Sequence, residues 1–288
     1  MPDFSNVLLL ADFDRTLTDT QSRIPARNVA AIRAFQARGG AFTVATGRSI
    51  PMFRPRASAI PYNVPLILYN GGAFYDYCTD ELTDPCWIRD GRVLLEYLAR
   101  EFPDLNLEVQ GKDAHYLFRD LPLRDAFYRR AETATAHVSF DEVPYPIIKA
   151  SLLGTYFDDS VPQFFTICPP EEVARFDEVQ RKISADWPEL TVDRASPRIL
   201  DIQGPSVNKG AAARRLAERL GRRLICVGDA RNDLSMLLEA DSAYAPADCE
   251  DAVRAAGIPL VCPCGEGAVA DVIALLAREN GMDDFKLD

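Results

Sequence analysis

Residues 7–14 read Val-Leu-Leu-Leu-Ala-Asp-Phe-Asp, an apolar run that ends in two carboxylates. Such a run is typical of a strand that is buried on both faces of a parallel sheet and whose carboxyl end opens onto a site. The next apolar residues recur at helical spacing before Gly39: Val29, Ile32 and Phe35. The beginning of the chain therefore predicts a buried strand followed by a crossover helix.

The same alternation of strand and helix returns in both terminal parts of the chain. Residues 41–45 and 65–69 read as strands, and residues 209–220 and 268–277 as helices. Further strands are expected at residues 224–227 and 259–262. Strands that alternate with helices predict an α/β fold, with a Rossmann-like parallel-sheet core and helices on both faces.

Between these parts the pattern changes. From about residue 82 to residue 204 the chain shows amphipathic helices interspersed with short strands, which suits an inserted α+β domain. We predict a catalytic core made of residues 1–82 and 205–288, and an inserted cap made of residues 83–204. The cap is expected to close over the site and to set substrate specificity.

Composition excludes several classes of protein. The 288 residues are 48% hydrophobic and carry a formal net charge of -11, which predicts a globular protein without a sequence-independent grip on nucleic acid or on an anionic membrane. The N-terminal apolar stretch is too short for a signal peptide, and no apolar run approaches the roughly 20 residues of a membrane span. We expect a cytoplasmic protein, and nothing in the sequence fixes its oligomeric state.

Polar side chains gather where the predicted strands end or helices begin. They are Asp12 and Asp14 after the first strand, Thr46 after the second, Lys209 at a helix start, and Asp229, Asn232 and Asp233 after residues 224–227. In an open parallel sheet the ligand site lies beyond the carboxyl ends of the strands. We therefore expect these groups to converge on one crevice.

Their chemistry suits phosphoryl transfer. Asp12 could attack phosphorus and form an aspartyl phosphate, which splits a difficult hydrolysis into two easier displacements. Carboxylates around a phosphoryl group would repel it unless a cation lay between them, and Mg²⁺ prefers such oxygen ligands. Asp229 is the expected further ligand. Asp14 could protonate the leaving oxygen and later take a proton from the attacking water.

Electrostatic donors would stabilise the charge that spreads over the transferring phosphoryl group. Thr46 offers a hydroxyl, Gly47 a backbone N–H and Lys209 a positive charge. Asp233 is expected to orient Lys209 or a metal-bound water. Four further residues are candidates for contact with the phosphate or the substrate: Arg48, Asn70, Lys149 and Asn232.

Four ordered segments carry a resemblance to a known family: residues Asp12-Phe13-Asp14-Arg15-Thr16-Leu17-Thr18, Thr46-Gly47-Arg48, Asn208-Lys209-Gly210 and Gly228-Asp229-Ala230-Arg231-Asn232-Asp233. They resemble the four motifs of the haloacid dehalogenase (HAD) superfamily, and the resemblance covers the whole chain. The Asn70-Gly71-Gly72 turn, the large insertion and residues 266–269 resemble its Cof-type branch of sugar-phosphate and related phosphatases.

The resemblance implies a fold and a set of roles. It implies a Rossmann-like core with an α+β cap, a nucleophile at Asp12 and an acid/base at Asp14. It also implies Mg²⁺ held by Asp12, Asp229 and the carbonyl of Asp14, and we place Asp233 at the same metal site. Arg15 departs from the pattern, because glycine is commonest there. A positive φ would strain an arginine at this position, and its side chain could also reach a substrate anion.

Three functions follow from this reading. The first is a Mg²⁺-dependent phosphomonoesterase that hydrolyses a small phosphorylated metabolite such as a sugar phosphate. The second is a sugar phosphomutase, which would need the same core residues and differ in how well the cap excludes water. The third is a catalytically silent binding or regulatory protein with the same fold. Neither a G-x-x-x-x-G-K-[ST] loop nor a G-x-G-x-x-G segment after a strand is present in the sequence.

Overall fold

The computed structural model describes residues 3–154 and 170–282, and the chain divides into two compact units. Unit 1 comprises Met1–Thr46, Ser58–Leu82 and Asn208–Asp288, and unit 2 comprises Gly47–Ala57 and Thr83–Val207. The domains predicted from the sequence differ from these units in two places. The short segment Gly47–Ala57 clusters with unit 2, and so do residues 205–207.

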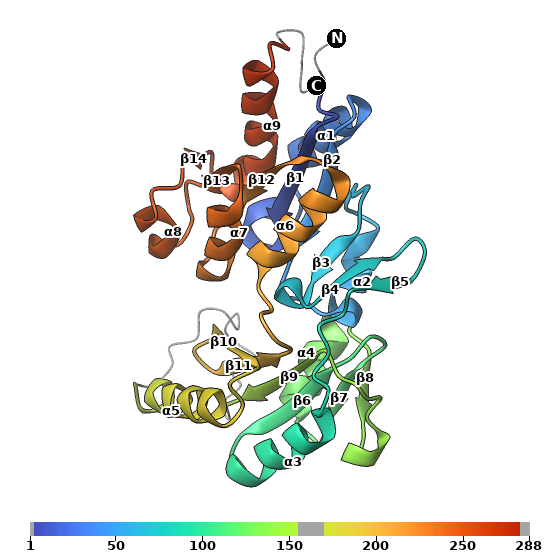
Figure 1. Cartoon of the computed structure of the whole chain (residues 1–288), viewed down its shortest axis with the longest axis vertical. Coiled ribbons are helices and arrows are strands. Elements are labelled where there is room, and N and C mark those ends of the chain that lie inside the picture. The colour runs from blue at the N-terminus through green and yellow to red at the C-terminus, as the bar shows by residue number, and fades with distance from the viewer. Residues whose placement is uncertain (1–2, 155–169, 283–288) are drawn as a thin grey trace. The chain divides into compact units, whose positions relative to one another are not determined.

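Unit 1 is built on a sheet of eight strands in the order β14-β13-β12-β1-β2-β3-β4-β5 (Figure 1). The strands are β1 (Val7–Asp12), β2 (Ala41–Ala45), β3 (Leu66–Leu68), β4 (Ala73–Asp76), β5 (Glu81–Thr83), β12 (Arg223–Val227), β13 (Ser242–Pro246) and β14 (Leu260–Val261). The strands from β14 to β3 run parallel, and β4 returns antiparallel to β3. All six residues of β1 are buried, as expected for a central parallel strand.

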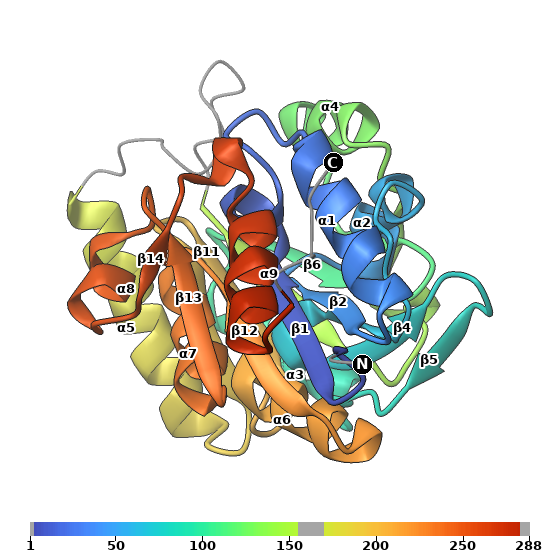
Figure 2. The same cartoon turned by 90° about the horizontal axis from the view of Figure 1, so that it is seen from above.

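Helices cover both faces of this sheet. The α-helices of unit 1 are α1 (Ala26–Ala37), α6 (Lys209–Leu220), α7 (Leu234–Glu239), α8 (Asp251–Ala255) and α9 (Ala268–Glu279). Short helical turns also occur: η1 (Phe13–Leu17), η2 (Tyr69–Gly71), η4 (Arg231–Asp233) and η5 (Cys264–Glu266). Helices α1 and α9 pack together on one face, and α6 and α7 on the other (Figure 2). The predicted α/β class with a parallel-sheet core is confirmed.

Unit 2 has a six-stranded sheet in the order β10-β11-β9-β6-β7-β8. Its strands are β6 (Asn106–Gln110), β7 (His115–Leu117), β8 (Thr135–His137), β9 (Lys149–Leu153), β10 (Thr191–Ser196) and β11 (Ile199–Gln203). Its helices are α2 (Ile50–Ala57), α3 (Gly91–Glu101), α4 (Pro122–Arg130), α5 (Pro170–Asp186) and the turn η3 (Phe140–Glu142). No helix in the described part of the chain is long and apolar enough to cross a membrane.

The two faces of the sheet in unit 2 differ in chemistry. On one face, apolar residues of β6, β9 and β11 form a core with Leu94 and Leu98 of α3 and with Phe176 and Val179 of α5. The opposite face carries buried polar side chains in two cross-strand rows. Strand register gives Gln203, Lys149, Gln110 and His115 in one row, and Asp201, Ser151 and Glu108 in the other.

His115 lies within this polar face and is fully buried. Its Nε2 atom lies 2.6 Å from the hydroxyl of Ser49, and its Nδ1 atom lies 4.0 Å from a carboxylate oxygen of Glu108. Burial lowers the pKa of His115 to about 3, although the Glu108 carboxylate opposes this shift. The imidazole is therefore neutral at pH 7, in an environment that disfavours its protonation.

The first prediction concerns the Asn70-Gly71-Gly72 turn beside the start of α6. Gly71 has φ +99, and a Cβ there would lie 2.4 Å from the carbonyl oxygen of Asn208. Gly71→Ala combines backbone strain with this clash, so we expect it to lower the free energy of unfolding by about 3 kcal/mol. Gly221→Ala is the matched control, because Gly221 has φ +61 and a Cβ there would meet nothing within 4 Å beyond the adjoining backbone, among the described residues. Strain alone should cost about 1 kcal/mol there. If urea unfolding showed the same loss in free energy of unfolding for both variants, the close approach of Gly71 to the Asn208 carbonyl would be contradicted.

The second prediction concerns the dependence of the free energy of unfolding on pH. The folded-state pKa of His115 is lower than the unfolded value of 6.5, so the unfolded chain takes up the proton first as the pH falls. The contribution of neutral His115 to the free energy of unfolding is therefore fully present above pH 6.5. Below this pH the contribution falls, by at most about 1.4 kcal/mol per pH unit. We expect His115→Gln to be less stable than the wild type at pH 7.5 but to lose stability less steeply between pH 6.5 and 4.5. His137→Gln, which replaces the other histidine, is the control. If the free energy of unfolding of His115→Gln fell with pH as steeply as that of the wild type, the lowered pKa of His115 would be refuted.

Candidate active site

The strand register of unit 1 brings separate parts of the sequence to one edge of the sheet. Asp12 is the last residue of β1, and Ala45 of β2 pairs with it, so Thr46 follows directly beyond that pair. On the other side of β1, Val227 of β12 pairs with the residue before Asp12. Asp229 therefore lies two residues beyond that pair. The predicted convergence of strand ends places these three residues at the same carboxyl edge.

Lys209 joins two of the carboxylates. Its Nζ atom donates to Asp12 Oδ1 at 2.5 Å and to Asp233 Oδ1 at 2.6 Å, and the Lys209 side chain is only 1% exposed. The other oxygen of Asp233 accepts hydrogen bonds from the backbone N–H groups of Asp229 and Ala230, at 3.1 and 3.0 Å. Asp233 thus orients Lys209 and also fixes the loop that carries Asp229.

Local sequence explains why Lys209 begins a helix. Asn208 is the N-cap of α6, and its side-chain oxygen accepts from the backbone N–H of Ala211 at 2.7 Å. A cation in the first turn of a helix opposes the helix dipole. The two carboxylates that contact Lys209 compensate for this placement, and they raise the pKa of Lys209 above its usual value although burial alone would lower it.

The site carries an excess of buried negative charge. Asp12, Asp229 and Asp233 are all buried, and one oxygen of each lies within 4.8 Å of the others. Burial and the nearby Asp233 raise the pKa of Asp12 well above its usual range, and the same two causes raise the pKa of Asp229 to about 7. One buried ammonium balances only one of the three charges. This cluster fits a divalent cation, and hard oxygen ligands of this kind suit Mg²⁺.

The turn that follows β1 shapes the approach to this cluster. Arg15 has φ 62, so the positive φ considered for this position is present and is occupied by arginine. Its backbone N–H donates to Thr18 Oγ1 at 3.2 Å. The Arg15 guanidinium lies 4.0 Å from the Asp229 carboxylate, and Nη2 donates to the carbonyl of Asp248 at 3.3 Å. Asp14, in the same turn, is partly buried and adds to the negative field at Asp12.

Thr16 is a site residue to which the sequence analysis gave no role. Its hydroxyl donates to Asp229 Oδ1 at 2.8 Å, and the residue is 0% exposed. This hydrogen bond fixes the carboxylate of a candidate metal ligand. The only signal in the sequence was the position of Thr16 within the first motif, because a buried threonine after a strand has no distinctive chemistry of its own.

Asn70 and Asn232 lie close to the same edge. The backbone N–H of Asn70 donates to the carbonyl of Thr46 at 2.9 Å, and the Asn232 amide lies 3.5 Å from Asn70 Oδ1. Asn70 has φ 55, a conformation that asparagine tolerates better than most residues. The remaining predicted contacts, Gly47, Arg48 and Lys149, belong to unit 2.

Comparison with known proteins assigns the family. The chain belongs to the haloacid dehalogenase-like hydrolase family, whose model matches residues 9–273. This finding confirms the family that the four ordered motifs predicted. The matched range includes every carboxylate of the cluster and Lys209.

Individual relatives are similar along most of the chain. YxeH of Bacillus subtilis, named as a candidate phosphatase, is 26% identical over 245 residues, which cover 80% of this chain and 83% of YxeH. YcsE of the same organism, a 5-amino-6-(5-phospho-D-ribitylamino)uracil phosphatase, is 23% identical over 253 residues, or 86% of each chain. The solved structure of the HAD subclass IIB sugar phosphatase BT4131 has a TM-score of 0.70 at 20% identity, covering 96% of this chain and 99% of BT4131. This last likeness shows a shared fold.

The third prediction tests the support that Thr16 gives to Asp229. Thr16→Val keeps the shape of the side chain but removes the hydrogen bond to Asp229, so we expect the affinity for Mg²⁺ to fall about 10- to 100-fold. The rise in melting temperature with added Mg²⁺ measures this affinity without any substrate. Thr43→Val is the matched control, because Thr43 is a buried threonine of β2 whose hydroxyl donates to the carbonyl of Pro65. Equal Mg²⁺ affinity in the two variants would contradict the role of Thr16.

Proposed function

We propose that this protein is a Mg²⁺-dependent phosphomonoesterase that hydrolyses a small phosphorylated metabolite through an aspartyl phosphate on Asp12. The observation that carries the proposal is the buried cluster at the carboxyl edge of the sheet. Asp12 is held by the ammonium of Lys209, and two further carboxylates lie within 4.8 Å of it. Membership of a hydrolase family and the phosphatase names of YxeH and YcsE support the same reaction.

In the first half-reaction an oxygen of Asp12 attacks the phosphorus atom, and the bond from phosphorus to the leaving oxygen breaks. Lys209 keeps the Asp12 carboxylate in one orientation and places a positive charge beside the developing negative charge. Asp14 donates a proton to the leaving oxygen. The alcohol leaves, and the phosphoryl group stays on Asp12.

In the second half-reaction Asp14 takes a proton from water, whose oxygen attacks the phosphorus of the aspartyl phosphate. The bond between phosphorus and the Asp12 oxygen breaks, which returns the carboxylate and releases inorganic phosphate. The hydroxyl of Thr46 is the proposed donor to the phosphoryl oxygens, together with backbone N–H groups of the turn that follows it.

Asp12, Asp229 and the carbonyl of Asp14 would hold the magnesium ion, which supplies positive charge that lets a phosphate approach a cluster of carboxylates. Asp233 has both oxygens engaged with Lys209 and with backbone N–H groups. Its proposed role at the metal site is therefore to orient Lys209 and the Asp229 loop.

The proposed substrate is a phosphorylated metabolite such as a sugar phosphate. YcsE acts on a phosphorylated ribityl compound and BT4131 is a sugar phosphatase, and both names pair a phosphate ester with a polyhydroxylated carbon chain. Unit 2 is the proposed cap. A sugar phosphomutase would use the same cluster, and it would yield an isomeric sugar phosphate instead of free phosphate. A catalytically silent binding protein would bind such metabolites without turnover.

The fourth prediction tests the nucleophile. Asp12→Asn removes the attacking carboxylate at nearly constant volume, so we expect phosphate release from an aryl phosphate with Mg²⁺ to fall by about 10⁴-fold or more. Asp3→Asn is the control for the isosteric change, because Asp3 is exposed and its side chain accepts hydrogen bonds from Ser5, outside the cluster. Retention of activity in Asp12→Asn would refute the assignment. Trapping of an isomerised sugar phosphate with the wild type would favour the mutase.

A further inference from the structure

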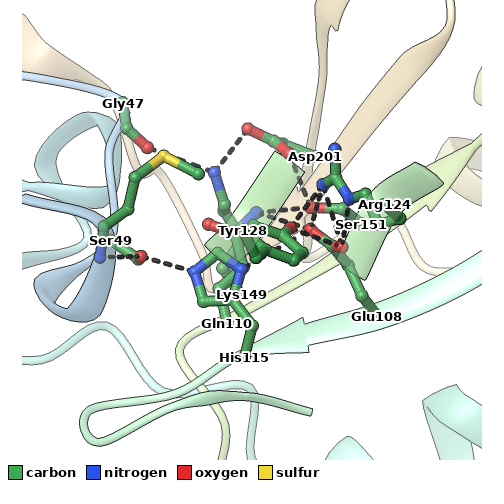
Figure 3. Close-up of polar contacts among 11 residues, drawn as sticks. Gly47, Ser49, Glu108, Gln110, His115, Arg124, Tyr128, Lys149, Ser151 and Asp201 are labelled. Atoms are coloured by element: carbon green, nitrogen blue, oxygen red, sulfur yellow. Dashed lines mark hydrogen bonds and ion pairs between the residues drawn. The ribbon is translucent and has the colours of Figure 1, made fainter. Parts of the chain in front are cut away.

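The turn that follows Thr46 belongs with unit 2. The chain leaves unit 1 after Thr46, and the next eleven residues, Gly47–Ala57, cluster with the sheet formed by the insertion. Two polar contacts, one partly buried and one buried, connect this segment to that sheet (Figure 3). Lys149 Nζ donates to the carbonyl oxygen of Gly47 at 3.2 Å, and Ser49 Oγ lies 2.6 Å from His115 Nε2.

Lys149 is fixed by its neighbours on the sheet. Its ammonium donates to Asp201 Oδ2 at 2.7 Å, and the other oxygen of Asp201 accepts from Ser151 Oγ at 2.7 Å. Lys149 and Asp201 are each 3% exposed, and the strands that carry them, β9 and β11, are paired neighbours. Because a buried charge needs a partner, the positive charge of Lys149 is used within this pair. The ammonium therefore reaches the Gly47 carbonyl from a fixed position.

The second contact orients the start of α2. Met52 donates its backbone N–H to Ser49 Oγ at 3.2 Å, and the same oxygen lies 2.6 Å from His115 Nε2. His115 Nδ1 lies on the side of the Glu108 carboxylate, 4.0 Å from one of its oxygens. Glu108 is in turn held by Arg124 at 2.9 Å and by the Tyr128 hydroxyl at 2.7 Å. The turn is thus anchored at Gly47 and at Ser49.

The contact at Gly47 controls a whole peptide plane. The carbonyl of Gly47 and the N–H of Arg48 belong to one planar trans peptide and point in opposite directions. Glycine restrains the rotation of this peptide less than any other residue does. A hydrogen bond from a buried, fixed ammonium to the carbonyl therefore also fixes the direction of the Arg48 N–H.

We propose that Lys149 is a positioning residue, which orders the Gly47–Arg48 peptide so that the turn after Thr46 presents its backbone N–H groups to the phosphoryl group. The inference rests on the proposed function, because that function makes this turn a phosphate-binding element. Lys149 acts through the peptide and does not itself grip the substrate.

The test compares the wild type with Lys149→Met/Asp201→Asn. In the double variant both charges and the bond to Gly47 are gone, and no buried ion is left unpaired. Either single variant is unsuitable, because Lys149→Met leaves Asp201 buried without its cation and Asp201→Asn leaves Lys149 buried without its anion.

Hydrogen–deuterium exchange of the ligand-free protein is the first readout. We expect the backbone amides of residues 46–52 to exchange faster in the double variant than in the wild type, with exchange in α3 unchanged. Equal exchange at residues 46–52 would overturn the proposal. A parallel rise in α3 would also overturn it, because it would show general loosening of unit 2.

Phosphate binding and kinetics are the second readout. We expect the affinity for inorganic phosphate with Mg²⁺ to fall about tenfold, and kcat for an aryl phosphate to fall about 10²-fold, in the double variant relative to the wild type. An effect on KM alone would contradict a positioning role. If the wild type neither binds phosphate nor hydrolyses the ester, the proposed function fails. The exchange experiment still decides whether Lys149 orders the turn.

Discussion

The ammonium of Lys209 between the carboxylates of Asp12 and Asp233 is the contact on which the rest of unit 1 depends. It joins the end of the central strand β1 to the loop after β12, and Asp233 extends the connection to the backbone of Asp229. Breaking one partner of a buried ion pair is far more costly than losing an exposed pair, because a charge is left without compensation. Lys209 and the Arg15 guanidinium, which lies 4.0 Å from Asp229, together carry less charge than the three carboxylates, and this negative excess makes the cluster suitable for a divalent cation.

In unit 2, by contrast, buried charges lie in pairs of opposite sign. Its buried polar face holds two ion pairs, Lys149 with Asp201 and Glu108 with Arg124, so the charges that these pairs bury balance each other. Such pairs contribute less to stability than to a specific arrangement, because desolvation offsets much of their attraction. The arrangement that they specify includes the turn at Gly47 and Ser49, which follows directly from the strand end of unit 1.

Much of the fold could be predicted from the sequence, and parts of it could not. The helix from Lys209 to Leu220 was predicted with its bounds, because an N-cap, helical periodicity and a following glycine mark it. Helix α2 was not predicted, since Pro55 in its interior removes a helical hydrogen bond and indicates a break. Its membership of unit 2 depends on contacts with residues far along the chain, which no local pattern reveals. At the site, the charged residues at strand ends could be predicted because their side chains suit phosphoryl transfer. Thr16 could not, because its role depends on a hydrogen bond to Asp229, which is distant in sequence and close only in the folded chain.

The proposed mechanism requires that the carboxylate at the end of β1 carries the phosphoryl group during turnover. Mass spectrometry of peptides from the enzyme, acid-quenched while it hydrolyses an aryl phosphate with Mg²⁺, detects this intermediate. We expect a phosphate on the peptide that contains Asp12, located on that side chain and lost when the peptide is exposed to base. Steady release of phosphate with no modified peptide, or with the phosphate on another residue, would contradict it.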